Sequence, residues 1–241
     1  MAIISNTVGY LDGDVLLEAF FAFDDSFSGR RPAVLIAPTW VGRDDFVAEK
    51  AKKLAALGYV GFAVDIYGKG LLGADAEENA RLMQPFMDDR QLLKKRMQAA
   101  LYAVRLMPWV DDAQVAAIGY CFGGLCSLDL ARAGADLKGV VSFHGLLGAP
   151  DIASDALIKA KILALHGHDD PMVPVEQVIA FEQEMSKAGA DWQLHAFGNT
   201  QHAFTNPLAD NPDFGTVYQP VADKRSWILM KNFLTEIFTQ S

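Results

Sequence analysis

Cys121 lies in the segment of this chain whose residue types and spacing best fit covalent chemistry. An apolar run that ends at Ile118 is followed by Gly119-Tyr120-Cys121-Phe122-Gly123-Gly124 and then by a helix-forming run. This spacing is typical of a nucleophile elbow, where small flanking residues allow a tight strand-to-helix turn. The turn would place the Cys121 sulfur at a helix N-terminus, where unpaired N–H groups favour a thiolate. We therefore predict that Cys121 is a nucleophile and that the Phe122 amide faces a developing oxyanion.

A cysteine nucleophile needs a general base, and five histidines could provide one. His202 lies in a polar, turn-forming stretch just beyond the last apolar run, so it is the preferred candidate. His195 lies within a strand pattern and is expected to be a packed or surface imidazole. His144 and His166 also follow apolar runs, and their positions alone do not exclude them.

The base in turn needs a carboxylate that orients it. Asp169 and Asp170 follow another predicted strand, and their spacing does not distinguish between them. With either aspartate, the chain order is Cys, Asp, His, which is the order found in α/β-hydrolases.

The elements that must position these residues alternate between apolar, β-rich runs and amphipathic helical runs. Strands are expected at residues 16–22, 33–37, 60–64, 115–118, 139–143, 162–165 and 193–196. Helices are expected from Asp44 or Asp45 to Gly58, from Asp88 to Pro108, and at residues 122–134 and 219–238, with loops around 71–85 and 205–217. Several strands are continuously apolar, as in a parallel sheet that is buried on both faces.

No shift in composition divides the chain, so we expect a single domain over residues 1–241. The alternation predicts an α/β fold with a mostly parallel, doubly wound central sheet of about seven or eight strands flanked by helices. The ligand site of such a sheet lies at the carboxyl ends of its strands.

Composition excludes several classes of partner and site. The net charge of -9 argues against nucleic acid, and no stretch approaches the roughly twenty apolar residues of a membrane span. The N-terminus does not resemble a signal peptide, and the two cysteines, Cys121 and Cys126, give no disulfide framework, so we expect a reduced, cytoplasmic protein. Their spacing within one helix would keep the two sulfurs apart, so a zinc site is not expected. The predicted chemistry of Cys121 requires neither a metal nor an organic cofactor.

Four motifs make the chain resemble the dienelactone hydrolase family of α/β-hydrolases over nearly its whole length. They are Gly119-Tyr120-Cys121-Phe122-Gly123-Gly124, Asp65-Ile66-Tyr67, Gly167-x-x-Asp170-x-x-Val173-Pro174 and His202-Ala203-Phe204. The resemblance implies the α/β-hydrolase fold, with Cys121 as nucleophile, His202 as base and Asp170 as orienting carboxylate. Asp169 is then expected to interact with solvent or with its own loop. The family pattern also implies that the Trp40 amide is a second oxyanion donor beside that of Phe122.

The chain departs from the best-known members of this family at three positions. Thr39 stands where they have a glutamate that is linked to ionisation of the cysteine, which implies a thiolate that does not depend on substrate. Lys69 and Asn206 stand where they have arginines, and neither offers the bidentate fork that binds a carboxylate. A dienelactone carboxylate is therefore not expected to be the natural substrate. The candidate substrate pocket consists of Thr39, Tyr67, Lys69, His144, Phe204 and Asn206.

The predicted function is hydrolysis of an ester or lactone bond in a small molecule, through a thioester formed on Cys121. Two other classes of function remain open at this point. A binding or regulatory protein could use the same scaffold without catalysis. A redox sensor could use Cys121 with Cys126 as the resolving thiol, although separation of the two sulfurs along a helix argues against it.

Overall fold

The computed structural model describes residues 2–150 and 157–239 of the chain. The chain forms two compact units, Met1–Ile118 and Gly119–Ser241. A central eight-stranded sheet has the strand order β1-β2-β4-β3-β5-β6-β7-β8 and is mostly parallel, as predicted. The expectation of a single domain stays a prediction, and the two units are described separately below.

The first unit begins with an antiparallel hairpin and continues as a parallel sheet. Its strands are β1 (Ile3–Asp12), β2 (Val15–Asp24), β3 (Arg31–Ala37), β4 (Val60–Ala63) and β5 (Val110–Tyr120), the last of which runs into the second unit. Its helices are α1 (Asp45–Ala55), α2 (Ala76–Asp88) and α3 (Arg90–Arg105). β2 pairs antiparallel with β1 and β4, whereas β3 pairs parallel with β4.

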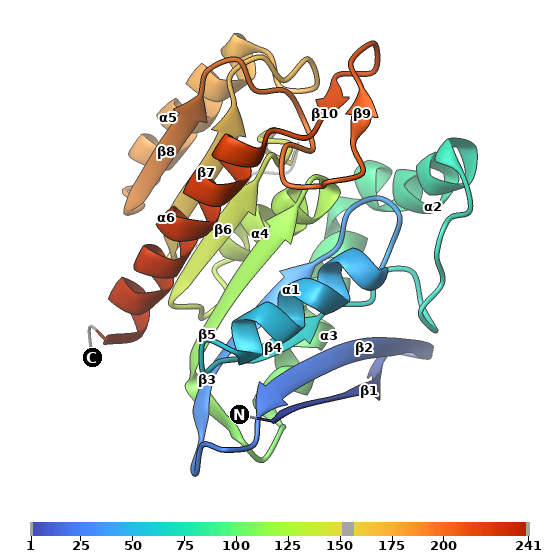
Figure 1. The fold of residues 1–241 in the computed structure, drawn as a ribbon, viewed down its shortest axis with the longest axis vertical. Coiled ribbons are helices and arrows are strands. Elements are labelled where there is room, and N and C mark those ends of the chain that lie inside the picture. The colour runs from blue at the N-terminus through green and yellow to red at the C-terminus, as the bar shows by residue number, and fades with distance from the viewer. Residues whose placement is uncertain (1, 151–156, 240–241) are drawn as a thin grey trace. The chain divides into compact units, whose positions relative to one another are not determined.

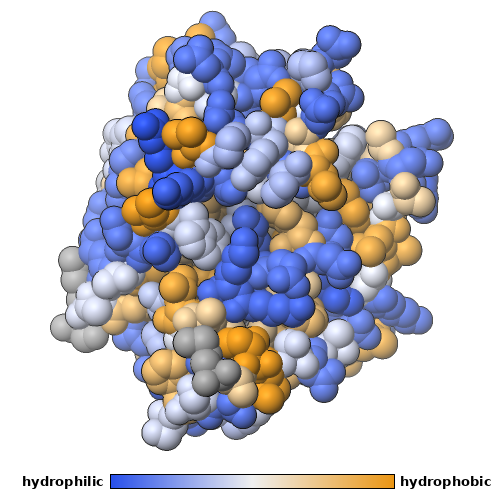
Figure 2. All heavy atoms as spheres, viewed as in Figure 1, coloured by the Kyte–Doolittle hydropathy of each residue, from blue (hydrophilic) through white to orange (hydrophobic). Residues whose placement is uncertain are grey.

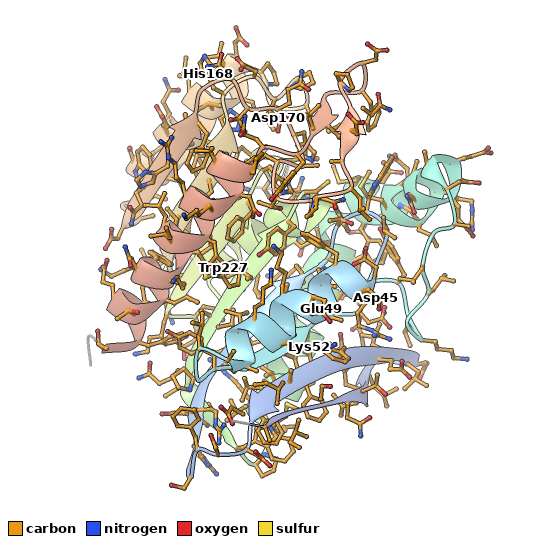
Figure 3. The ribbon with its side chains drawn as sticks, viewed as in Figure 1. Asp45, Glu49, Lys52, His168, Asp170 and Trp227 are labelled. Carbon is orange, nitrogen blue, oxygen red and sulfur yellow. The ribbon has the colours of Figure 1, made fainter. Side chains whose placement is uncertain are left out.

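The bounds and the buried side of helix α1 follow from a capping residue and an amphipathic pattern in its sequence. The Asp44 side chain accepts a hydrogen bond from the Val47 amide and caps the helix, as expected. Asp45 and Glu49 point away from the sheet in Figure 3, and Figure 2 shows the outward side of α1 as largely hydrophilic. The Lys52 ammonium instead lies over the Phe20 ring of β2, 5.8 Å from its centroid. The opposite side is apolar and buried, with Val47, Ala51, Leu54 and Ala55.

Three elements of the first unit differ from the sequence-based expectation. Strand β1 was not predicted, because most of its side chains are exposed and its apolar residues do not alternate regularly with polar ones. Helix α2 lies where a loop was expected, because its capping residue Asp75 precedes a helix that buries only Asn79 and Phe86. The cap of α3 is Asp89 rather than Asp88, since the Asp89 carboxylate accepts from the second and third amides of that helix.

The second unit contains parallel strands, helices and a short hairpin. Its strands are β6 (Gly139–Phe143), β7 (Lys161–Gly167), β8 (Trp192–Phe197), β9 (Asp210–Asn211) and β10 (Thr216–Val217). Its helices are α4 (Phe122–Arg132), α5 (Val175–Lys187) and α6 (Pro220–Thr239). β6, β7 and β8 pair in parallel, and α6 packs along β6 and β7 (Figure 1). Helix α5 and the β9–β10 hairpin were not predicted.

None of the described helices combines the length and the apolar character that crossing a membrane requires.

Candidate active site

Cys121 occupies the turn between β5 and α4, with backbone angles φ 56° and ψ -120°. A positive φ is uncommon for a residue with a side chain and marks local strain of the kind found at functional sites. The Cys121 amide donates to the Phe143 carbonyl at the end of β6, at 3.0 Å. Gly119 must lack a side chain, because a Cβ there would collide with the Gly123 carbonyl oxygen. The half-buried Cys121 therefore lies on the predicted elbow, whereas Cys126 is buried within α4.

Gly124 packs the first turn of α4 against the segment after β6. A Cβ at Gly124 would lie 2.5 Å from Ser142 Oγ and 2.7 Å from Gly145 Cα, so the backbone would have to shift. We expect Gly124→Ala to lower the free energy of unfolding by about 1–3 kcal/mol, measured by urea denaturation. Gly198→Ala is the matched control, because its Cβ would meet no atom within 4 Å. Equal urea midpoints for the two variants would contradict the expected crowding.

Asp170 and His202 form a buried pair at the carboxyl end of β7. Asp170 Oδ2 lies 2.7 Å from His202 Nδ1, and the two residues are only 3% and 1% exposed. Asp170 Oδ1 accepts from the Met172 amide at 2.9 Å, so both carboxylate oxygens have partners. Figure 3 shows Asp170 on the same loop as His168, beyond the end of β7. The neighbouring Asp169 is exposed, so tertiary packing distinguishes two aspartates that spacing left equivalent.

The loop that carries His202 is held by its own backbone and by a close approach to β7. The His202 amide donates to the Gly215 carbonyl at 2.9 Å, and the Val217 amide donates to the His202 carbonyl at 3.0 Å. The β9–β10 hairpin thus fixes the position of the His202 backbone. A Cβ at Gly167 would lie 2.6 Å from the carbonyl oxygens of Thr200 and Gln201, so glycine permits this contact.

The surroundings of His202 favour its charged form. Burial lowers its pKa, but attraction to the Cys121 thiolate and the hydrogen bond with Asp170 outweigh burial and raise the pKa of His202 to about 10. Nδ1 is bonded to Asp170, whereas the buried Nε2 forms no hydrogen bond with the described residues. This arrangement is compatible with the predicted order of nucleophile, base and orienting carboxylate, Cys121, His202 and Asp170.

The other candidate bases occupy different surroundings. Burial lowers the pKa of His166, which lies within β7 and is nearly inaccessible, so it is neutral. His195 is a partly exposed residue of β8, with its Nε2 at 3.2 Å from Gln193 Oε1. His202, rather than His166 or His195, is therefore the histidine that is bonded to a buried carboxylate and interacts electrostatically with Cys121.

His144 and Phe204 are buried in the second unit, with exposed fractions of 1% and 0%. Their ring centroids lie 5.0 Å apart in an edge-to-face arrangement, so they form packing behind the site and offer no surface to a substrate. This differs from the expected pocket-lining role, because an apolar run before His144 does not reveal on which side of the backbone the ring lies. Asn206 is half-buried, and its Oδ1 accepts from the Leu208 amide at 3.0 Å.

The candidate residues of the first unit surround the loop after β3. Tyr67 Oη donates to the Trp40 carbonyl at 2.8 Å, so these two residues lie together. The Thr39 hydroxyl lies 3.3 Å from the Val41 amide within the same loop. The buried Asp65 carboxylate accepts from four amides, including that of Tyr67, and shapes the next loop. Lys69 on that loop is exposed and has a φ of 51°.

No group of three or more His, Cys, Asp or Glu residues in the described part of the chain could hold a metal ion. No disulfide joins Cys121 and Cys126.

Comparisons with known proteins bear on the family and the fold of this chain. The sequence model of the "Dienelactone hydrolase family" matches residues 17–238. The crystal structure of a dienelactone hydrolase-like promiscuous phosphotriesterase from metagenomic libraries superposes with a TM-score of 0.94, at 40% identity, over 99% of this chain and 100% of the other. A Yersinia pestis protein with the provisional name carboxymethylenebutenolidase is 25% identical over 91% of this chain and 84% of its own length. A Bradyrhizobium protein with the provisional name 2-oxo-3-(5-oxofuran-2-ylidene)propanoate lactonase is 26% identical over 83% of this chain and 82% of its own.

Proposed function

This chain belongs to the dienelactone hydrolase family and is a hydrolase of carboxylic esters or lactones, and we propose that it acts through a thioester on Cys121. The observation that carries the proposal is the buried His202, which is hydrogen-bonded to the Asp170 carboxylate at 2.7 Å and interacts electrostatically with Cys121 on the nucleophile elbow. A binding protein or a redox sensor would not require this arrangement.

In the proposed reaction, the Cys121 thiolate attacks the ester or lactone carbonyl and forms a tetrahedral intermediate. The Phe122 amide is one oxyanion donor, because it is among the first amides of α4 and has no carbonyl partner within that helix. The family pattern assigns the Trp40 amide as the second donor. Loss of one such donor typically costs on the order of 2.7–4 kcal/mol of transition-state stabilisation.

His202 then acts twice in the proposed reaction. As the intermediate collapses, the imidazolium gives its Nε2 proton to the leaving alkoxide, and the acyl group remains as a thioester on Cys121. The neutral imidazole next takes a proton from water, which attacks the thioester and releases the acid. Asp170 holds His202 in the tautomer that both steps need. No metal or organic cofactor takes part.

The substrate class follows from the three departures from the family pattern. Thr39 has no carboxyl group, so we propose that Cys121 is already a thiolate before substrate binds and that substrate does not trigger its ionisation. Lys69 and Asn206 replace two arginines, which weakens recognition of a carboxylate. We therefore propose small neutral esters or lactones as substrates. A thiolate nucleophile also favours reducing surroundings, such as the cytoplasm.

The experiment that tests this function is a panel of initial rates for the wild type and for Cys121→Ala. The panel contains short aryl esters, small lactones and a dienelactone carboxylate. We expect turnover of the esters or lactones that falls by at least about 10³-fold in the variant, with weak turnover of the dienelactone carboxylate. Ester hydrolysis that persists in folded Cys121→Ala would refute the cysteine mechanism.

A second candidate activity rests on the similarity to the metagenomic phosphotriesterase, which covers 99% of this chain at 40% identity. We propose that aryl phosphotriesters are a secondary substrate class of the same thiolate. An aryl phosphotriester in the panel, compared between the wild type and Cys121→Ala, tests this activity. Absence of Cys121-dependent turnover would exclude it without affecting the ester proposal.

A further inference from the structure

His144 contacts three parts of the candidate active site although it offers no surface to a substrate. The Cys121 amide donates to His144 Nδ1 at 3.2 Å, in addition to its bond with the Phe143 carbonyl. His144 Nε2 lies 2.8 Å from Thr205 Oγ1, on the loop three residues after the proposed base. The His144 and His202 rings meet edge to face, with centroids 5.1 Å apart. One buried side chain thus joins the nucleophile to the loop of its base.

The backbone of His144 is held in an unfavourable conformation to make these contacts. Its φ of 40° lies in the left-handed region, where a bulky side chain is disfavoured. The His144 amide donates to the Leu165 carbonyl of β7 at 2.8 Å, which anchors the residue to the sheet. Glycine would adopt this conformation without strain, so the strain points to a role for the ring itself.

The hydrogen bonds assign one form of the His144 ring. Nδ1 accepts from the Cys121 amide and therefore carries no proton, so the ring proton lies on Nε2 and is donated to Thr205 Oγ1. A neutral ring is also the form that fits beside the charged His202, because two imidazolium rings at this separation would repel each other. The bond with Thr205 is buried and the bond with the Cys121 amide is partly buried, and both favour the same ring orientation.

We propose that His144 is a positioning residue, which aligns Cys121 with His202 by bridging the Cys121 amide to Thr205 and by packing against the His202 ring. This inference rests on the proposed cysteine mechanism. His144 touches neither substrate nor reacting atoms, and acts by limiting movement between the two loops. Misalignment of the sulfur and the imidazole lowers the rate of the chemical step and leaves substrate binding nearly unchanged.

The test compares two substitutions of His144. Both introduce a residue that tolerates a positive φ, but only one of them keeps an acceptor for the Cys121 amide. His144→Gly removes the ring and relaxes the backbone, whereas His144→Asn keeps an acceptor oxygen near the place of Nδ1. Thr205→Val removes the second partner at nearly constant shape. The control is His195→Leu, on β8 outside the site. The readouts are kcat and KM for a hydrolysed ester, the alkylation rate of Cys121 by iodoacetamide, and the melting temperature.

We expect His144→Gly to lower kcat at least about tenfold with KM within about twofold, and His144→Asn to return kcat to within about threefold of the wild type. Thr205→Val should fall between them, and His195→Leu should match the wild type. The alkylation rate should follow the same order. Equal losses of kcat in His144→Gly and His144→Asn, or an unchanged kcat in His144→Gly, would overturn the inference.

The same experiment separates this inference from the proposed function. If folded Cys121→Ala still hydrolyses the ester, the cysteine mechanism fails. If hydrolysis depends on Cys121 but His144→Gly retains the wild-type kcat and alkylation rate, only the role of His144 fails. The alkylation rate reports on Cys121 without any substrate, so the comparison of Gly with Asn decides the inference even where turnover is weak.

Discussion

An Asp170→Asn variant should lose about four orders of magnitude in kcat while it keeps its fold. Asp170 Oδ2 accepts from His202 Nδ1 at 2.7 Å, which holds the ring with Nε2 toward Cys121. An asparagine can present its N–H₂ group instead and stabilise the tautomer whose proton lies on Nε2, so His202 no longer accepts a proton there. The measurement is kcat for the best ester of the panel, with circular dichroism as a check of folding.

Asp169→Asn is the matched control for this variant. Asp169 is the adjacent residue, is exposed, and is expected to change kcat by less than about twofold. The pair therefore separates loss of the orienting carboxylate from a general loss of charge in the loop. A loss below about tenfold in Asp170→Asn, or equal losses in the two variants, would argue that His202 does not depend on this carboxylate.

The second large effect is expected in the pH dependence of Cys121 alkylation. Because the pKa of His202 is raised from its usual value near 6.5 to about 10, the imidazolium beside the sulfur persists until the pH approaches that value. A thiolate held by this charge reacts at low pH as well. We expect the rate with iodoacetamide to change less than about threefold between about pH 6 and pH 9, whereas a free thiol near pKa 8.5 changes by about two orders of magnitude.

A His202→Leu variant should restore the steep profile of an ordinary thiol, because the neighbouring positive charge is gone. Cys121 is followed by peptide mass spectrometry, which separates its alkylation from that of the buried Cys126. A steep wild-type profile with a midpoint near 8.5 would contradict the standing thiolate and would indicate activation by substrate instead. A flat profile in both proteins would show that the start of α4, and not His202, lowers the pKa of the thiol.

Much of the molecule follows from local patterns along the chain. Glycines around Cys121 predict the elbow because the tight turn has no room for larger side chains, and the structure shows those contacts. Continuously apolar runs predict the buried parallel strands. An unbroken run of apolar residues places apolar side chains on both faces of a strand, and so indicates that both faces are buried. Asp44 predicts the start of α1, because capping depends on residues only three apart.

The tertiary structure decided what depends on contacts between distant segments. Asp169 and Asp170 are adjacent carboxylates, and only packing of the His202 loop against β7 buries one of them at the imidazole. Strand β1 and helix α2 contain apolar residues but bury few side chains, so burial in a core does not mark them along the chain. His144 resembled a pocket residue from its place after a strand. Its positive φ turns the ring back toward the Cys121 amide, and no spacing along the chain encodes that direction.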